Sequence, residues 1–442
     1  MKDYDKASVD SIFSFSKQLT GKSIGQFAPP GAPELNSNHK GELGTLVEKW
    51  FFRHTPPNNT EPDFAEAGLE LKTTGVVRHK SGYRAKERLK LTKLNFHTVV
   101  DESWETSTLV RKCRRMLILF YLYSGELKTL DRPFILPPLL YNLLGDDGPT
   151  IRNDWLAIRA KVLQGKAHEI SESDTYYLGA ARSGQGGSKE RKVDQPFSDE
   201  KAWARALVFK QSYVSSLVAN HGSSLTAMGV KDALTFEGLV AERFRPYFGK
   251  SVRQIREEVM SENLSNKIKN LNSLLAKRIL ADTDGEILEL TKANVVVKTV
   301  TLNHRGTPKE SMSFPAMNFR KVAHETWEES DLFETFETKK FLFVVFAKDQ
   351  AGIEKLLKVG FWNMPHSDFQ ELGIVWQNTK DAINADRPVF PQSGENPVGH
   401  VRPHAARASD VMDFPSGRKV TKQSFWLNAK YLKTVIANLP EF

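Results

Sequence analysis

An acid followed by an acid-x-lysine triplet is the pattern in this chain that most directly suggests chemistry. The residues are Asp63 and, seven positions later, Glu70 with Lys72. Glu70 and Lys72 belong to an alternating stretch, 69–73, that predicts a strand, so their side chains should project from one face. Two converging carboxylates can hold a hard divalent cation, and a nearby lysine can orient water or stabilise charge on a phosphate. The spacing predicts a metal-dependent hydrolytic site.

The pattern corresponds to the PD-(D/E)xK arrangement of metal-dependent nucleases, with Pro62 preceding Asp63. Acid-x-lysine triplets are also common on exposed strands, where they do nothing catalytic. The motif alone therefore leaves both interpretations open, and its surroundings must decide between them.

The elements expected to position these residues form a mixed α/β pattern. Apolar periodicity predicts a helix over 42–52, and residues 65–68 suit a turn between Asp63 and the strand. An apolar run over 116–121 has the length of a buried strand, and 203–218 is interpreted as a helix after a glycine-rich loop. We expect α/β domains with mixed sheets flanked by helices.

Short matches show that the chain contains a diverged duplication. They occur in the same order in both halves, and the offset between them shrinks steadily, as loop trimming after duplication would produce. The period is far longer than that of a solenoid repeat. We therefore predict a first domain over 1–218, a linker over 219–232 and a second domain over 233–442. The matched pairs are Gly21-Lys22-Ser23 with Gly249-Lys250-Ser251, Lys72-Thr73 with Lys298-Thr299, Asn95-Phe96 with Asn318-Phe319, Trp104-Glu105 with Trp327-Glu328, and 210–213 with 422–425.

The composition is basic and contains enough hydrophobic residues to form hydrophobic cores. The 442 residues carry a formal net charge of +9, and a basic balance suits a polyanionic partner such as nucleic acid, although many basic proteins bind none. The single cysteine, Cys113, excludes an internal disulfide, which fits a reducing cytoplasm. We find no secretory signal and no apolar run long enough for a membrane span, so a cytoplasmic location is expected.

The segment 63–73 closely resembles the active-site segment of the MutH family of endonucleases and of the restriction enzymes that share its fold. Upstream, 40–48 is similar to the family's first active-site helix, whose glutamate matches Glu48. Downstream, 104–107 is similar to a further family segment, and the family's additional lysine matches Lys112. The resemblance reaches both halves and is greatest to the tandem MutH-like type II restriction endonucleases.

This resemblance implies two tandem MutH-like domains that cut double-stranded DNA at a GATC-like site with Mg²⁺. It implies that Asp63 and Glu70 bind Mg²⁺, while Glu48 supports the site or shares a second ion. Lys72 would assist the attacking water, and Lys112 would contact the region of the scissile phosphate.

The second copy has lost most of this set. The offsets place Ala276 opposite Glu48, Glu289 opposite Asp63, Val296 opposite Glu70 and Thr335 opposite Lys112, while Lys298 matches Lys72. Glu289 still offers one carboxylate, which can suffice for Mg²⁺ with substrate phosphate. We expect a second domain that does not cut; it either binds another copy of the site and promotes cleavage, or only supports the first domain.

Most residues expected to contact DNA come from segments that resemble the family's terminal and DNA-reading segments, and Arg182 is added as an arginine that could read guanine. Arg402 is expected to read guanine, the commonest specific contact in the major groove, whereas base reading and phosphate contact stay equally open for Arg182. The first copy has Gly179-Ala180-Ala181 near the family's arginine-proline, which leaves its mode of site reading open. The full set is Arg182, Lys210, Gln211, Arg402, Pro403, His404 and Lys422.

Two other functions compete with restriction. A mismatch-repair-type nicking endonuclease needs one copy of the domain, so the duplication argues against it. A DNA-binding regulator without catalysis does not account for a complete acid set in the first copy. For the restriction enzyme, a cognate methyltransferase would act on the same site without direct contact, and a monomer in solution could pair on DNA.

Overall fold

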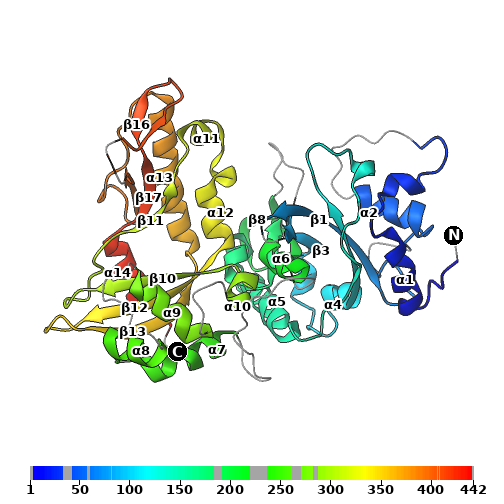
Figure 1. Ribbon diagram of the computed structural model, residues 1–442, viewed down its shortest axis with the longest axis horizontal. Coiled ribbons are helices and arrows are strands. Elements are labelled where there is room, and N and C mark those ends of the chain that lie inside the picture. Colours follow the sequence, from blue (N-terminus) through cyan, green and yellow to red (C-terminus); the bar gives the residue numbers. More distant parts are fainter. Residues whose placement is uncertain are drawn as a thin grey trace. The chain divides into compact units, whose positions relative to one another are not determined.

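The computed structural model describes residues 3–32, 42–56, 60–80, 82–183, 192–219, 236–260, 270–281, 287–405, 407 and 409–440. The chain forms two compact units (Figure 1): unit 1 holds 1–225 with 291–293, and unit 2 holds 226–290 with 294–442. The predicted linker over 219–232 lies outside the described residues from position 220 onward. None of the described helices is long and apolar enough to cross a membrane.

A four-stranded mixed sheet carries the site region of unit 1. Its order is β2 (Gly82–Ala85), β1 (Glu70–His79), β4 (Arg115–Leu122) and β5 (Leu139–Asn142). β1 runs parallel to β4, and the other two pairs are antiparallel. Residues 116–120 of β4 are buried, as expected of a central strand whose apolar residues cover both faces. The predicted strand over 69–73 is the beginning of β1.

A second sheet in unit 1 corrects one expectation. It has the order β3 (Leu89–Leu94), β9 (Arg205–Phe209) and β6 (Leu178–Arg182), all antiparallel, beside a hairpin of β7 (Lys192–Gln195) and β8 (Ser198–Trp203). The helix predicted over 203–218 is wrong in its first half, because all of β9 is buried at the centre of this sheet. The helix α6 begins at Gln211, after the strand has ended.

Helices and one aromatic cluster enclose these sheets. The ring of Phe52 lies 5.3 Å from that of Phe64, just after Asp63, and 4.9 Å from that of Phe51. This packing fixes the chain on either side of the short π-helical turn at Val47–Phe51. The α-helices of unit 1 are α1 (Val9–Ser16), α2 (Glu42–Leu46), α3 (Phe96–Val99), α4 (Thr108–Cys113), α5 (Gly148–Leu163) and α6 (Gln211–Ala219). Shorter 3-10 turns cover Lys17–Leu19, Ile24–Phe27, Thr129–Asp131, Ala167–Glu169 and Glu172–Asp174.

Unit 2 repeats the arrangement of sheets. One sheet has the order β10 (Val295–Leu302), β12 (Lys340–Lys348) and β13 (Glu354–Trp362), with β10 and β12 parallel and β13 antiparallel to β12. The other is antiparallel, β11 (Met312–Ala316), β17 (Gln423–Leu427) and β14 (Gly399–Pro403), beside a hairpin of β15 (Val411–Asp413) and β16 (Lys419–Thr421). Each unit thus pairs a mixed sheet with an antiparallel one.

The helices of unit 2 surround one large hydrophobic core that includes Phe319, Phe336 and Trp376. They are α7 (Phe236–Phe244), α8 (Val252–Val259), α9 (Leu271–Ala281), α11 (Phe319–His324), α12 (Asp331–Thr338), α13 (His366–Asn384) and α14 (Ala429–Ala437). The short helix α10 (Leu288–Lys292) precedes β10, and 3-10 turns cover Arg245–Tyr247 and Trp327–Glu329.

The matched tripeptides form the same local structure in both units. Gly21 and Gly249 have left-handed φ angles of 80° and 78°, which favour glycine. The Gly21 N–H donates to the Phe134 carbonyl at 2.7 Å, and the Gly249 N–H donates to the Leu356 carbonyl at 2.9 Å. The likeness of these turns supports the duplication inferred from sequence.

Helix caps repeat as well. The side chains of Asn95 and Asn318 cap α3 and α11, and those of Ser107 and Ser330 cap α4 and α12. Each capping side chain satisfies backbone N–H groups at the first turn of its helix. The matched pair Asn95 and Asn318 thus starts a helix in each unit, as do Ser107 and Ser330.

The last match of the repeat is wrong in structural terms. Residues 210–213 follow β9 and begin α6, whereas 422–425 lead into β17. β9 and β17 are the equivalent strands, because each lies at the centre of its antiparallel sheet. The similar letters therefore occupy different places in the two units.

Candidate active site

A tight turn brings Asp63 to the start of β1. Phe64 and Leu69 exchange backbone hydrogen bonds of 2.9 and 3.2 Å, which close the turn over 65–68. Gly68 has a φ of 59° in this turn, a conformation that other residues rarely adopt. The chain therefore reverses directly after Asp63 and enters β1 with Glu70 as its first residue.

The two carboxylates of the motif lie together and are buried. The backbone N–H of Asp63 donates to Oε2 of Glu70 at 3.2 Å, and the N–H of Leu71 donates to Oδ2 of Asp63 at 2.9 Å. The exposed fraction is 8% for Asp63 and 2% for Glu70. The backbone thus holds both acids in a fixed geometry, as a pre-organised site requires.

Two lysines approach the same carboxylate. Nζ of Lys72 lies 2.7 Å from Oε1 of Glu70 and donates to the Leu91 carbonyl in β3 at 3.2 Å. Nζ of Lys112, on α4, lies 3.4 Å from that same Oε1. The mixed sheet, the antiparallel sheet and α4 therefore all contribute to one cluster.

Glu48 joins this cluster electrostatically. The pKa of Glu48 is raised to about 7, chiefly by burial and also by the negative charges of Asp63 and Glu70, with Lys72 and Lys112 opposing the shift. Burial also raises the pKa of Glu70, with Asp63 adding to the effect against the two lysines. The cluster thus contains three acids and two lysines. When all three acids are ionised, a bound cation would stabilise their negative charges.

The donor set fits Mg²⁺ through two carboxylates. Among the described residues, no group of three or more His, Cys, Asp or Glu side chains is arranged to hold a metal ion. Mg²⁺, however, is commonly held by one or two carboxylates together with water and substrate phosphate. Asp63 uses one oxygen for the Leu71 N–H and retains the other for such a ligand.

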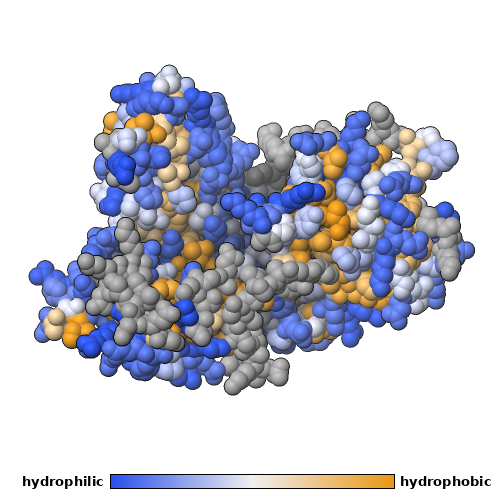
Figure 2. Space-filling view, in the orientation of Figure 1, coloured by the Kyte–Doolittle hydropathy of each residue, from blue (hydrophilic) through white to orange (hydrophobic). Residues whose placement is uncertain are grey.

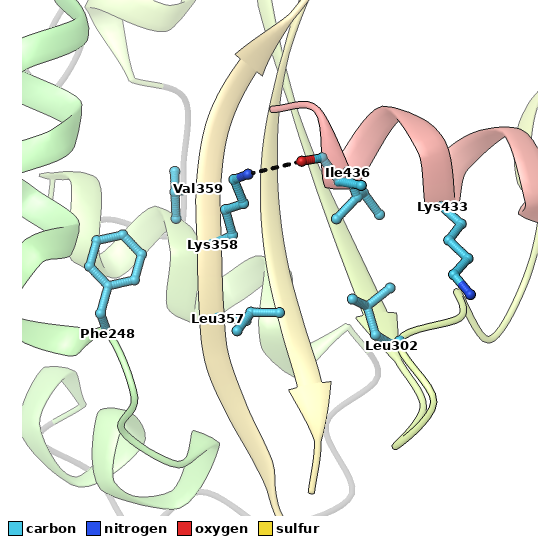
Figure 3. A pocket seen from close by; sticks show the side chains of 9 residues that line it. Phe248, Leu302, Leu357, Lys358, Val359, Lys433 and Ile436 are labelled. Carbon is cyan, nitrogen blue, oxygen red and sulfur yellow. Dashed lines mark hydrogen bonds between the residues drawn. The ribbon is translucent and has the colours of Figure 1, made fainter. Parts of the chain in front are cut away.

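A pocket in unit 2 is a poor alternative for catalysis. It has a volume of about 460 Å³ and lies between β13 and α14 (Figure 3). Its lining is mostly apolar, and Lys358 donates to the Ala437 carbonyl at 3.5 Å. None of its lining residues carries a carboxylate that could bind a metal ion, so the acid and lysine cluster of unit 1 is the better candidate active site.

Comparison with known proteins matches the part of the chain that holds this cluster. The family model for the DNA mismatch repair enzyme MutH matches residues 52–154, a range that contains Asp63, Glu70, Lys72 and Lys112. The chain is 29% identical to the type II restriction enzyme Sau3AI of Staphylococcus aureus over 97% of its own length and 98% of that enzyme. The chain is thus similar to Sau3AI over nearly its whole length and to the MutH family model over residues 52–154.

The MutH proteins match a smaller part of the chain. The DNA mismatch repair protein MutH of Vibrio campbellii is 26% identical over 35% of the chain and 68% of its own length. The MutH protein of Actinobacillus pleuropneumoniae is 25% identical over 37% of the chain and 72% of its own length. The similarity to Sau3AI, in contrast, spans both units.

The strand register compares the two units residue by residue. Glu70 pairs with Met116, the second residue of β4, and Val296 pairs with Phe341, the second residue of β12. Lys298 in turn occupies the register position of Lys72. Unit 2 therefore has valine where unit 1 has the central carboxylate, and it keeps the lysine.

The other residues matched to the site in unit 2 have different surroundings. Glu289 is buried in helix α10, whereas Asp63 lies beside a turn. Ala276 is buried in α9. Thr335 lies in α12, which is eight residues long where α4 has six, so the helix position and the strand position no longer agree there.

Lys210 is the site prediction that must be corrected. It is 2% exposed, and its Nζ donates to the Thr175 carbonyl inside unit 1. A lysine with so little exposure cannot contact DNA phosphate in this fold, and it serves the packing of unit 1. The neighbouring Gln211 is exposed, but its side-chain amide donates to the carbonyls of Ala85 and Lys86.

The two arginines expected to meet DNA each lie over a tryptophan. The guanidinium of Arg402 is 3.8 Å from the ring centroid of Trp426, and that of Arg182 is 4.9 Å from Trp203. Arg402 is exposed, whereas Arg182 is partly buried. Strand pairing shows that these arginines are not equivalent, because Arg182 lies at the position of Pro403.

The remaining predicted DNA contacts lie near Arg402. Pro403 and His404 are exposed, and Nδ1 of His404 is 2.7 Å from the Ser424 hydroxyl. Lys422 is partly exposed next to β17. Hydrophilic residues predominate on the visible surface around α11, in the same unit (Figure 2).

One contact of the site was missed by the sequence reasoning. Nε2 of His54 lies 2.6 Å from the backbone carbonyl of Asp63, and its ring stacks on Phe64 at 4.7 Å. This contact helps hold Asp63 in place. Histidine carries no motif at that position, so only the three-dimensional structure reveals it.

Proposed function

We propose that this chain is a type II restriction endonuclease, a Mg²⁺-dependent enzyme that cuts both strands of DNA at a short site, GATC. The observation that carries the proposal is the buried pair Asp63 and Glu70 with two lysines at one carboxylate oxygen. This cluster lies in the segment that matches the MutH model. The relative similar over the whole length, Sau3AI, is itself named a type II restriction enzyme.

The residues of unit 1 divide the work of hydrolysis. Asp63 and Glu70 would hold the Mg²⁺, with Glu48 behind them. Mg²⁺, when bound, supplies polarisation of the phosphate and a bound water of lowered pKa. Lys72, fixed between Glu70 and the Leu91 carbonyl, orients the attacking water.

Lys112 reaches the cluster from a different element and serves the phosphate. Its Nζ faces the same oxygen of Glu70 from α4, a helix whose start is fixed by the Ser107 cap. A lysine in this position can stabilise negative charge that grows on the phosphate during the reaction. Lys72 and Lys112 thus act on the nucleophile and the phosphate respectively.

Unit 2 is proposed to bind a further copy of the DNA site without cutting it. The similarity to Sau3AI covers this unit too, and Val296 replaces the central carboxylate. Exposed cations lie near its end, including Arg402, Arg407 and Lys419. The cognate methyltransferase would modify the same site without touching this chain, and two protomers could pair on DNA.

Digestion of a plasmid of known sequence, with and without Mg²⁺, tests the proposal. We expect linear fragments only when Mg²⁺ is present, and sequencing of their ends should find breaks at one short sequence. A nicked circle as the final product would instead favour a mismatch-repair-type nicking endonuclease; the MutH relatives are named DNA mismatch repair proteins. Binding of DNA without any Mg²⁺-dependent product would instead indicate a DNA-binding regulator without catalysis.

A further inference from the structure

Lys298 in unit 2 matches Lys72 of unit 1 in position, but the acid that pairs with Lys72 has no counterpart beside it. It occupies the strand register of Lys72, whose Nζ lies 2.7 Å from Glu70. Two residues before Lys298, on the same face of the strand, Val296 stands at the position of Glu70. The counter-ion that neutralises this lysine in unit 1 is therefore absent from its counterpart in unit 2.

The surroundings of Lys298 are apolar and positively charged. Its Nζ lies 5.7 Å from the ring centroid of Phe314, and the side chain is partly buried. Burial lowers the pKa of Lys298, and the charge of Lys339, at the end of α12, lowers it further. Within the part of the chain that the structure describes, neither lysine forms an ion pair or a side-chain hydrogen bond.

Two neighbouring cations in partly dry surroundings destabilise a fold unless an anion compensates them. In unit 1 that anion is a carboxylate of the chain itself, whereas in unit 2 valine stands at its position and an anion from outside can take its role. A phosphate group suits two lysines, because lysine ammonium groups bind phosphate oxygens as point charges.

We propose that Lys298 and Lys339 form a phosphate-binding site in unit 2, where a phosphate group takes the place of the Glu70 carboxylate. The phosphate can belong to the backbone of duplex DNA or be free inorganic phosphate. The site goes beyond the proposed nuclease function, because binding at Lys298 needs neither Mg²⁺ nor cleavage. It rests on the proposed function solely for DNA as the source of the phosphate.

The first test introduces an acid at position 296, where unit 1 has Glu70. Val296→Glu should place a carboxylate beside Lys298 and exclude the phosphate, whereas Val296→Gln, of equal size and without charge, should leave the site open. Lys298→Met and Lys339→Met remove one cation each, and Lys430→Met, at an exposed lysine of α14, is the matched control.

Two probes are used with the full chain in EDTA. Inorganic phosphate, compared with chloride at equal ionic strength, should raise the Tm of the wild type, Val296→Gln and Lys430→Met. That shift should be lost in Val296→Glu, Lys298→Met and Lys339→Met. For duplex DNA, fluorescence anisotropy should show the slope of log K against log salt falling by about 0.9 in Lys298→Met, the loss of one phosphate contact.

Each outcome either tests whether the phosphate site exists or identifies DNA or free phosphate as its ligand. Loss of both responses supports a site for the DNA backbone, and loss of the phosphate response alone supports a site for free phosphate. If Val296→Glu and Lys298→Met respond to both probes as the wild type does, the site does not exist. Failure of the nuclease would not be confused with this result, because Glu70→Ala should keep both responses.

Discussion

Replacing Glu70 by alanine is the most informative perturbation of the proposed nuclease. The substitution removes one of two buried carboxylates and deprives Lys72 of its partner at 2.7 Å. It also leaves the backbone N–H of Asp63 without the Glu70 oxygen that accepts it at 3.2 Å. Metal binding and the placement of the lysine should therefore fail together, while the surface that binds DNA loses only a negative charge.

The expected size follows from these two losses. Removing a single pre-organised electrostatic contact commonly lowers a rate by about 10²–10³-fold. Since Glu70 serves both the metal and Lys72, we expect cleavage to fall by at least about 10³-fold, or ~4 kcal/mol in activation free energy. DNA binding in EDTA should remain within a few-fold of the wild type or become tighter.

Single-turnover cleavage of a plasmid, with anisotropy for binding, measures both quantities. Glu70→Gln keeps the volume of the side chain and should be as inactive as Glu70→Ala. Glu66→Ala, at an exposed acid of the adjacent turn, should cut at the wild-type rate. Wild-type cleavage by a folded Glu70→Ala protein would refute the assignment, and equal loss in Glu66→Ala would show that the effect is not specific to the cluster.

Three further predictions concern stability and recognition. Burial raises the pKa of Glu48 to about 7, so its protonated form is favoured by folding. The metal-free protein should therefore lose about 1–2 kcal/mol, after discounting for a half-buried group, as pH rises from 5 to 8. Urea unfolding in EDTA should show this slope and a smaller one in Glu48→Gln, since the raised pKa of Glu70 contributes in the same direction; identical slopes would exclude Glu48 as a source. Ser107→Ala should cost about 1 kcal/mol and lower Tm by about 2–4 °C, because Ser107 caps the helix that carries Lys112; an unchanged Tm in calorimetry would argue against the cap. Arg402→Lys keeps the charge but loses the planar group that stacks on Trp426, so binding to a site-containing duplex should weaken by about 1–3 kcal/mol with little change for a random duplex, whereas equal weakening of both would indicate a phosphate contact.

The centre of the candidate site could be anticipated because its geometry is local. Asp63, Glu70 and Lys72 lie within ten residues, and strand parity alone places Glu70 and Lys72 on one face. Glu48 and Lys112 are different, because they reach the cluster through a π-helical turn and through α4. No periodicity of the sequence predicts those approaches, and their selection depended on resemblance to the MutH family.

The errors arose where tertiary structure outweighs local pattern. Residues 205–209 form a central strand because neighbours on both sides supply hydrogen bonds, although the stretch beginning at Trp203 suited a helix. Lys210 follows that strand into the interior and finds the Thr175 carbonyl, a partner 35 positions away in the chain. Charge suggested a DNA contact for Lys210, and burial, which the sequence does not show, excludes it.

The two units together separate what the scaffold provides from what the chemistry needs. The paired turns at Gly21 and Gly249 and the strand register are shared, so the fold does not depend on the acids. At the strand position beside the lysine, Val296 stands in place of Glu70, so Lys298 lacks the carboxylate that Lys72 has and lies near the Phe314 ring instead. If Glu70 is a metal ligand as proposed, that one change removes the ligand and leaves room for an outside anion at the same place, so loss of cleavage and gain of phosphate binding need not be separate evolutionary steps. The behaviour of Val296→Glu thus tests whether one position determines which kind of ion each copy of the fold attracts.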